Sequence, residues 1–121
     1  MTEHIPRILV VDDEKHICAA IAALVKGEGF KALVAQDGNT ALKMIRSEGP
    51  DLILVDIKMP EMDGMEVMRQ AKDLDPDLPV VMITAFAEIH GAVKAIKAGA
   101  HDYLSKPFNN EEVIRVIHLF T

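Results

Sequence analysis

Residues 52–64 read LILVDIKMPEMDG, and this stretch contains the strongest indication of the fold. Four apolar residues run directly into a carboxylate, Asp56, which is followed by a Lys-Met-Pro loop. A short, continuous apolar run predicts a strand that is covered on both faces, as the strands of parallel sheets are. Because an unpaired carboxylate is costly to bury, a strand that ends in one indicates that the charge has a partner or a task.

Similar apolar runs recur along the chain and alternate with a second pattern. We expect strands at 7–12, 30–35, 51–56, 78–84 and 101–105. Between these runs, apolar residues recur three and four positions apart, which is the period of a helix with one buried face. We expect helices at 14–27, 39–48, 64–74, 87–98 and 110–120. Strict alternation with short connections predicts an α/β domain, in which helices cover both faces of a parallel sheet.

The composition indicates a single globular domain in a reducing compartment. Half of the 121 residues are hydrophobic, and the single cysteine, Cys18, offers no disulfide framework. The first residues lack the layout of a secretory signal, and no apolar run approaches the length of a membrane span. The net charge is −6 and the basic residues are scattered, which argues against direct binding of nucleic acid. We therefore expect a cytoplasmic domain that binds neither membrane nor nucleic acid.

Polar residues stand where four of the predicted strands end. Asp12 and Asp13 follow the first strand, Asp56 ends the third, Thr84 ends the fourth and Lys106 follows the fifth. Each residue alone has a plainer explanation, such as a carboxylate that starts a helix or a lysine in solvent. Ligands of open α/β sheets bind beyond the carboxyl ends of the strands, where these residues are expected to converge. The combination therefore predicts one functional site.

The residue types at this site favour phosphoryl chemistry. Three carboxylates held together repel one another unless a cation lies between them, and oxygen ligands of this kind suit Mg²⁺. A carboxylate can also attack phosphorus and form an aspartyl phosphate, provided that positive charge stabilises the phosphoryl oxygens. Lys106 and the metal would supply that charge, and the Thr84 hydroxyl would supply a hydrogen bond. Asp56 is then the predicted nucleophile.

Four motifs together resemble a known family. They are ILVVDDE (8–14), DLILVDIKMPEMDGMEVM (51–68), VVMITAF (80–86) and KAGAHDYLSKPF (97–108). In this order and spacing they closely resemble the receiver domain of two-component response regulators, over nearly the whole chain. The resemblance implies a flavodoxin-like (βα)5 fold, doubly wound, with a five-stranded parallel sheet in the order 2-1-3-4-5. The segment from Ala87 to Phe108 is further similar to receivers of the nitrogen-regulator class, which precede an ATPase that activates transcription through an alternative sigma factor.

The resemblance also implies how a metal is held. Asp56 would accept a phosphoryl group from a phosphohistidine of a sensor histidine kinase. Asp13, Asp56 and the backbone carbonyl of Lys58 would coordinate Mg²⁺, or Mn²⁺ in its place, and Asp12 would assist through water. Lys106 would pair with the phosphoryl oxygens.

The resemblance implies a switch as well. Thr84 would move to bond the phosphoryl group and Tyr103 would turn inward behind it, while the Lys106–Pro107 peptide bond is expected to be cis. The surface of helix 87–98, strand 101–105 and helix 110–120 would then change shape and control an output domain or a downstream protein. Formation of a homodimer through this surface is a further expectation.

Residues 1–121 are expected to form one receiver domain at the N-terminal part of a longer protein, because the last predicted helix reaches Thr121 without a stop signal. We expect a phosphoacceptor that transfers phosphate to itself and dephosphorylates itself, and otherwise no enzyme. Two alternatives stay open: a metal-dependent phosphohydrolase, and a phosphate-independent interaction module with a vestigial site. We also expect the bulky Phe86 to slow loss of the phosphate.

Overall fold

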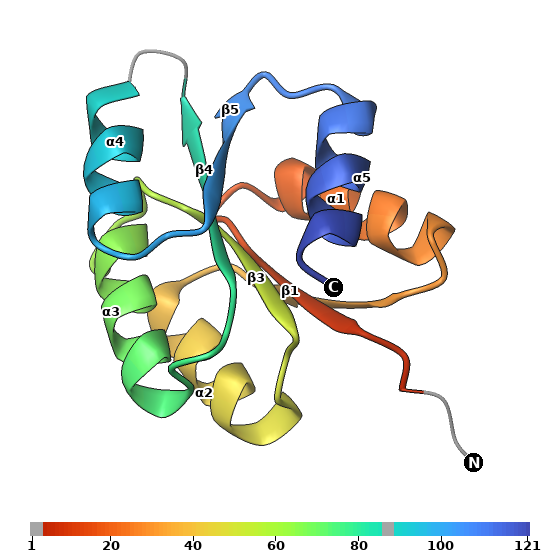
Figure 1. Cartoon of the computed structure of the whole chain (residues 1–121), viewed down its shortest axis with the longest axis horizontal. Helices are drawn as coiled ribbons and strands as arrows, with labels where there is room; N and C mark the ends of the chain where they lie inside the picture. The colour runs from red at the N-terminus through yellow and green to blue at the C-terminus, as the bar shows by residue number, and fades with distance from the viewer. Residues whose placement is uncertain (1–3, 86–88) are drawn as a thin grey trace.

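The computed structural model describes residues 4–85 and 89–121 and contains one parallel sheet of five strands (Figure 1). The strands are β1 (Arg7–Val11), β2 (Lys31–Ala35), β3 (Leu52–Asp56), β4 (Val80–Ala85) and β5 (Asp102–Lys106). Their order in the sheet is β2-β1-β3-β4-β5, which confirms the expected flavodoxin-like topology. Because the order reverses beside β1, the carboxyl ends of β1 and β3 lie at the switch point, where open α/β sheets bind ligands.

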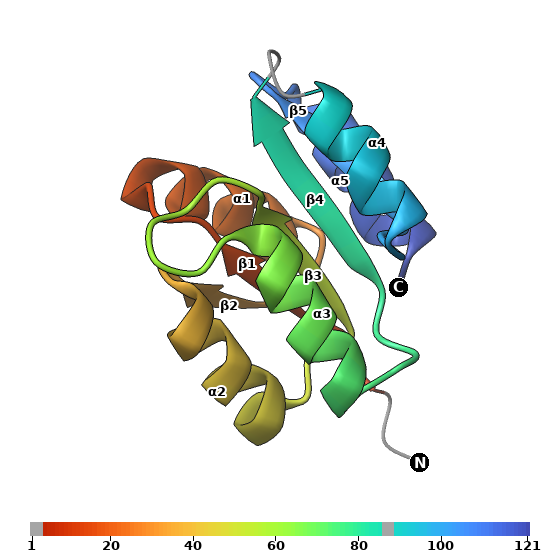
Figure 2. The same ribbon diagram turned by 90° about the vertical axis from the view of Figure 1, so that its left-hand side faces the viewer.

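Five helices of the described segments cover the two faces of this sheet. They are α1 (Lys15–Gly27), α2 (Gly38–Glu48), α3 (Gly64–Leu74), α4 (Ile89–Lys97) and α5 (Asn110–Leu119). Helices α2, α3 and α4 lie on one side, and α1 and α5 lie on the other (Figures 1 and 2). The two residues with which the fourth predicted helix begins, 87 and 88, lie outside the described part of the chain. Within that part, no helix combines the length and the apolar character that crossing a membrane requires.

Alternate residues of the central strands build two separate cores. In β1, Leu9 and Val11 belong to the core under α2 and α3, whereas Ile8 and Val10 belong to the core under α1 and α5. All five residues of β3 are buried, as its continuous apolar pattern predicts. The central strands are therefore held on both faces, and Asp56 occupies a fixed position at the end of one of them.

Short polar side chains begin three of the helices. The side chains of Asp37, Asp63 and Asn109 each accept a hydrogen bond from the backbone N–H three residues further on, as N-caps do. At the other end of α2, Gly49 adopts a left-handed conformation with φ of 56°, which a glycine adopts without strain. These signals fix where the helices begin and end relative to the strands.

The ends of the last two strands differ slightly from the sequence expectation. Strand β4 begins at Val80 instead of residue 78, and β5 extends one residue beyond its predicted end at Ser105. The extension has a physical cause, because Ala85 pairs with Lys106 in the parallel ladder between β4 and β5. Lys106 is therefore a strand residue, and the sheet itself aims its side chain.

Candidate functional site

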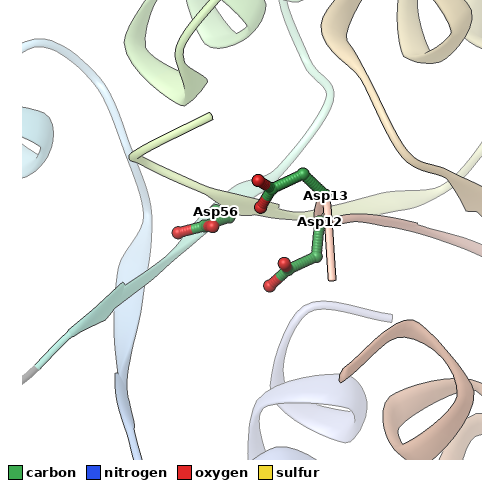
Figure 3. A group of neighbouring side chains, drawn as sticks. All are labelled: Asp12, Asp13 and Asp56. Carbon is green, nitrogen blue, oxygen red and sulfur yellow. The ribbon is translucent and has the colours of Figure 1, made fainter. Parts of the chain in front are cut away.

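The predicted site residues meet at the carboxyl edge of the sheet. Asp12 and Asp13 follow β1 directly, and Asp56 is the last residue of β3. In Figure 3 their side chains extend from neighbouring points of this edge. One carboxylate oxygen from each of the three lies within 4.8 Å of the others, so the group has the spacing of a metal site. Asp12 and Asp56 are buried, and Asp13 is exposed.

Lys106 places its ammonium group among these carboxylates. Its Nζ lies 2.8 Å from Asp12 Oδ2, 3.5 Å from Asp56 Oδ2 and 3.8 Å from Glu14 Oε2. Burial alone would lower the pKa of Lys106, but the contact with Asp12 and the charges of Asp56 and Glu14 outweigh burial and raise it. The lysine is therefore held as a cation between the ends of β1 and β3.

The environment of Asp56 opposes its ionisation. Burial, followed by the charge of Asp12, raises the pKa of Asp56 to about 6, although Lys106 and the backbone N–H of Lys58 act in the opposite direction. A cation beside the carboxylates would offset both unfavourable effects. The site thus carries more negative charge than Lys106 alone stabilises.

Asp12 has one backbone hydrogen bond and one close ion pair. Its Oδ1 accepts a hydrogen bond from the backbone N–H of Glu14 at 2.9 Å. Its Oδ2 is buried, and although Lys106 lies close to it, no described residue gives this oxygen a hydrogen bond of good geometry. An all-oxygen donor set with a buried, incompletely satisfied carboxylate fits a hard cation such as Mg²⁺. The residues present therefore fit the metal that the sequence predicts.

Thr84 and Tyr103 occupy two different environments. The Thr84 side chain is buried beside the site, and its hydroxyl donates a hydrogen bond to the carbonyl of Ala85 at 3.3 Å. Tyr103, the second residue of β5, is 38% exposed and thus stands partly in solvent. The Lys106–Pro107 peptide bond is cis. Phe86, for which the sequence suggests an effect on phosphate loss, lies outside the described residues.

A cleft of about 230 Å³ opens between these residues. Its lining consists of Asp13, Glu14, Asp56, Ile57, Lys58, Thr84, Ala85 and Lys106. Most of the predicted site residues therefore face one common space. Sequence reasoning missed Glu14 as a member of the site, although its position directly after the aspartate pair was a signal that could have identified it.

The loop from β3 to α3 is folded tightly against Asp56. The backbone N–H of Gly64 donates to the carbonyl of Ile57 at 2.8 Å, which closes the loop that carries Lys58. A Cβ at position 64 would overlap the carbonyl oxygen of Asp56 and would lie 2.9 Å from the Cα of Ile57. Only glycine fits there without movement of the backbone, so Gly64 sets how closely this loop approaches the acidic cluster.

The fold and site define a class of α/β protein with a carboxylate cluster and a lysine at the switch point of its sheet. Residues 8–118 match the family of response regulator receiver domains. The chain therefore belongs to the response regulator receiver domain family, as the sequence motifs predict. Phosphorylation-dependent switching is the general function of this family, and its members generally bind Mg²⁺.

Individual relatives agree with this assignment. The transcriptional regulatory protein ZraR of Klebsiella oxytoca is 42% identical over 88% of this chain and 24% of its own length. The regulatory protein AtoC of Escherichia coli is 38% identical over 93% of this chain and 24% of its own length. The crystal structure of the receiver domain of NtrX from Brucella abortus superposes with a TM-score of 0.89 at 38% identity, over 93% of this chain and 95% of that domain.

The chain thus spans about a quarter of the length of ZraR and AtoC. The similarity to these proteins and to NtrX agrees with the expected likeness to the nitrogen-regulator class. The family assignment favours a switch over the phosphohydrolase and over the vestigial interaction module.

Proposed function

We propose that Asp56 accepts a phosphoryl group from a phosphohistidine of a sensor histidine kinase. A bond forms between an Asp56 carboxylate oxygen and phosphorus, while the bond between phosphorus and the histidine nitrogen breaks and its electrons remain on the imidazole. The observation that carries this proposal is the position of Asp56, a buried carboxylate at a strand end, facing a cleft that Lys106 and Thr84 also line.

The acidic cluster is the proposed site of Mg²⁺, with Mn²⁺ as the substitute. Asp13, Asp56 and the backbone carbonyl of Lys58 would hold the ion, and Asp12 would assist through water. When bound, the metal supplies positive charge that the phosphoryl oxygens require. The donor set supports this proposal, because the three carboxylates converge within 4.8 Å and Asp12 Oδ2 is incompletely satisfied.

Lys106 and Thr84 are the proposed partners of the phosphoryl group. Lys106 Nζ already lies 3.5 Å from Asp56 Oδ2, so a short movement brings it to an oxygen of the phosphate. The Thr84 hydroxyl would leave the Ala85 carbonyl and donate to the phosphate instead. Tyr103 would then turn from its partly exposed position into the space behind Thr84 and reshape the surface formed by α4, β5 and α5.

This surface would control an output domain or a downstream partner, with a homodimer as one outcome. The relatives ZraR and AtoC, which are four times longer than the matched region, support a longer protein of the sigma-factor-activator class. We place the protein in the cytoplasm, where the kinase and reduced Cys18 would be found. Its chemistry is restricted to its own phosphorylation and dephosphorylation, without turnover of a small substrate.

Intact-protein mass spectrometry tests the proposal. The protein is incubated with Mg²⁺ and acetyl phosphate beside an Asp56→Asn variant. We expect a single phosphoryl adduct on the wild type, absent from the variant and lost on standing. If no adduct forms and the phosphoryl mimic beryllium fluoride does not bind either, the vestigial interaction module replaces the switch.

A further inference from the structure

Lys106 has a third carboxylate neighbour that the proposed phosphoryl transfer does not use. Glu14 Oε2 lies 3.8 Å from Lys106 Nζ and also 3.6 Å from His16 Nε2. The Glu14 side chain is half exposed and is one of the residues that line the cleft. Glu14 is therefore an exposed negative charge at the cleft that contains Asp56 and Lys106.

The backbone holds Glu14 in this position. Its N–H donates to Asp12 Oδ1 at 2.9 Å, and the residue is the N-cap of α1 with an extended conformation. Its side chain makes no capping hydrogen bond to α1. The carboxylate thus remains available to Lys106, from which it lies 3.8 Å away.

We propose that Glu14 is a positioning residue that sets how strongly the site binds a phosphoryl group. This inference rests on the proposed function of Asp56 and Lys106. Together with Asp12, Glu14 attracts the Lys106 ammonium toward α1, and the lysine must weaken these contacts before it pairs with a phosphoryl oxygen. The Glu14 charge also repels the incoming anion directly.

The negative charge of Glu14 should affect the binding of Mg²⁺ and the binding of a phosphoryl group in opposite directions. A carboxylate at the cleft attracts Mg²⁺ and repels a phosphoryl group, because the interaction energy changes sign with the charge of the ligand. Removal of the charge in Glu14→Gln should therefore weaken binding of Mg²⁺ and strengthen binding of beryllium fluoride at saturating Mg²⁺. A merely structural defect would weaken both.

The size of each effect follows from distance and exposure. A unit charge a few Å away in a partly solvated cleft changes an affinity by about threefold to tenfold. Salt screens exposed charges, so the effect should decrease as the ionic strength rises. Glu14→Asp keeps the charge with a shorter side chain and should restore most of the Mg²⁺ affinity.

The test measures both affinities by calorimetry for the wild type, Glu14→Gln, Glu14→Asp and a control, Glu48→Gln. Glu48 is exposed at the end of α2, at the opposite edge of the sheet, so its substitution changes the net charge equally without reaching the site. We expect Glu14→Gln alone to bind Mg²⁺ about threefold to tenfold more weakly and beryllium fluoride more tightly by a similar factor, at low salt.

The outcomes separate this inference from the proposed function. If the wild type binds beryllium fluoride but Glu14→Gln behaves as Glu48→Gln does, the role of Glu14 is wrong while the phosphoryl site stands. If Glu14→Gln weakens both ligands, Glu14 supports the structure of the site and does not tune it. If the wild type itself does not bind beryllium fluoride, the proposed function and this inference are both overturned.

Discussion

Lys106 is paired more closely with Asp12 than with the acceptor Asp56. Its Nζ lies 2.8 Å from Asp12 Oδ2 and 3.5 Å from Asp56 Oδ2. Because Asp12 is buried and its Oδ2 has no described hydrogen bond of good geometry, this lysine offsets a charge that the fold would otherwise bury unpaired. Lys106 therefore stabilises the metal-free domain as well as the proposed phosphoryl group.

Substitution of Lys106 should reveal this structural role. Lys106→Met keeps much of the side-chain volume but removes the ammonium, which leaves Asp12 and Asp56 to repel each other. We expect the free energy of unfolding without metal to fall by about 3 kcal/mol at pH 7, the usual cost of an unpaired buried charge. Urea denaturation measures the change. Added Mg²⁺ should stabilise the variant more than the wild type, and equal stabilisation of both would show that Lys106 does not offset the cluster.

The raised pKa of Asp56 predicts a dependence of stability on pH. Its pKa changes from 3.8 to about 6 on folding, so between these values the folded state binds more protons than the unfolded state does. The contribution of Asp56 to stability is complete below the pKa of the unfolded state. It is lost as the pH rises through the higher pKa of the folded state. The loss is about 3 kcal/mol for a shift of this size.

Asp56→Asn removes this titration and resembles the protonated side chain. Without metal, we expect the variant to be more stable than the wild type at pH 8, and the difference to disappear near pH 4. Urea denaturation over this pH range measures both free energies. A difference that stays constant with pH would contradict the raised pKa. With Mg²⁺ the difference at pH 8 should decrease, because a cation favours the ionised carboxylate.

The tight approach of Gly64 to Asp56 is testable with a matched pair of glycines. A Cβ at Gly64 would overlap the Asp56 carbonyl, whereas a Cβ at Gly27, the last residue of α1, meets nothing within 4 Å. We expect Gly64→Ala to lower the free energy of unfolding by about 2 kcal/mol, as overpacking does, and to weaken Mg²⁺ binding. Gly27→Ala should be neutral or stabilising by less than about 1 kcal/mol. Equal effects of the two substitutions would refute the positional argument.

Tyr103 provides an optical measurement of the proposed switch. It is the only tyrosine, and the chain has no tryptophan, so its fluorescence reports one position. The Tyr103 side chain is 38% exposed, so acrylamide should reach it. We expect Mg²⁺ with beryllium fluoride to reduce quenching by acrylamide as the ring turns inward. In Thr84→Ala the reduction in quenching should be small, because the ring follows the threonine. If the reduction is as large as in the wild type, the Tyr103 ring moves independently of Thr84.

The sheet was predictable because its apolar runs leave few arrangements. The continuous run in 52–55 can only be buried on both faces, and the alternation of strands with helices then requires a parallel sheet. The order of its strands came from the family resemblance and not from periodicity. The boundaries of β4 and β5 were less accurate, because the pairing of Ala85 with Lys106 is a contact between strands that no local pattern records.

The site was predictable in its members but not in its contacts. Strand-end positions identified Asp12, Asp56 and Lys106, since the carboxyl ends of parallel strands share one edge. That Lys106 lies nearer to Asp12 than to Asp56 depends on side-chain geometry, which spacing does not determine. The position of Glu14 after the aspartate pair placed it near the site, but its contact with Lys106 likewise depends on side-chain geometry.

Asp56 is the proposed carrier of the phosphoryl group, and chemical trapping can identify the modified residue. Borohydride reduces an aspartyl phosphate to homoserine, so treatment of the acetyl phosphate-modified protein marks the modified residue permanently. Peptide mass spectrometry then locates the homoserine. We predict homoserine at position 56 only, and none after omission of Mg²⁺. Homoserine at Asp12 or Asp13 instead, with Asp56 unchanged, would contradict it.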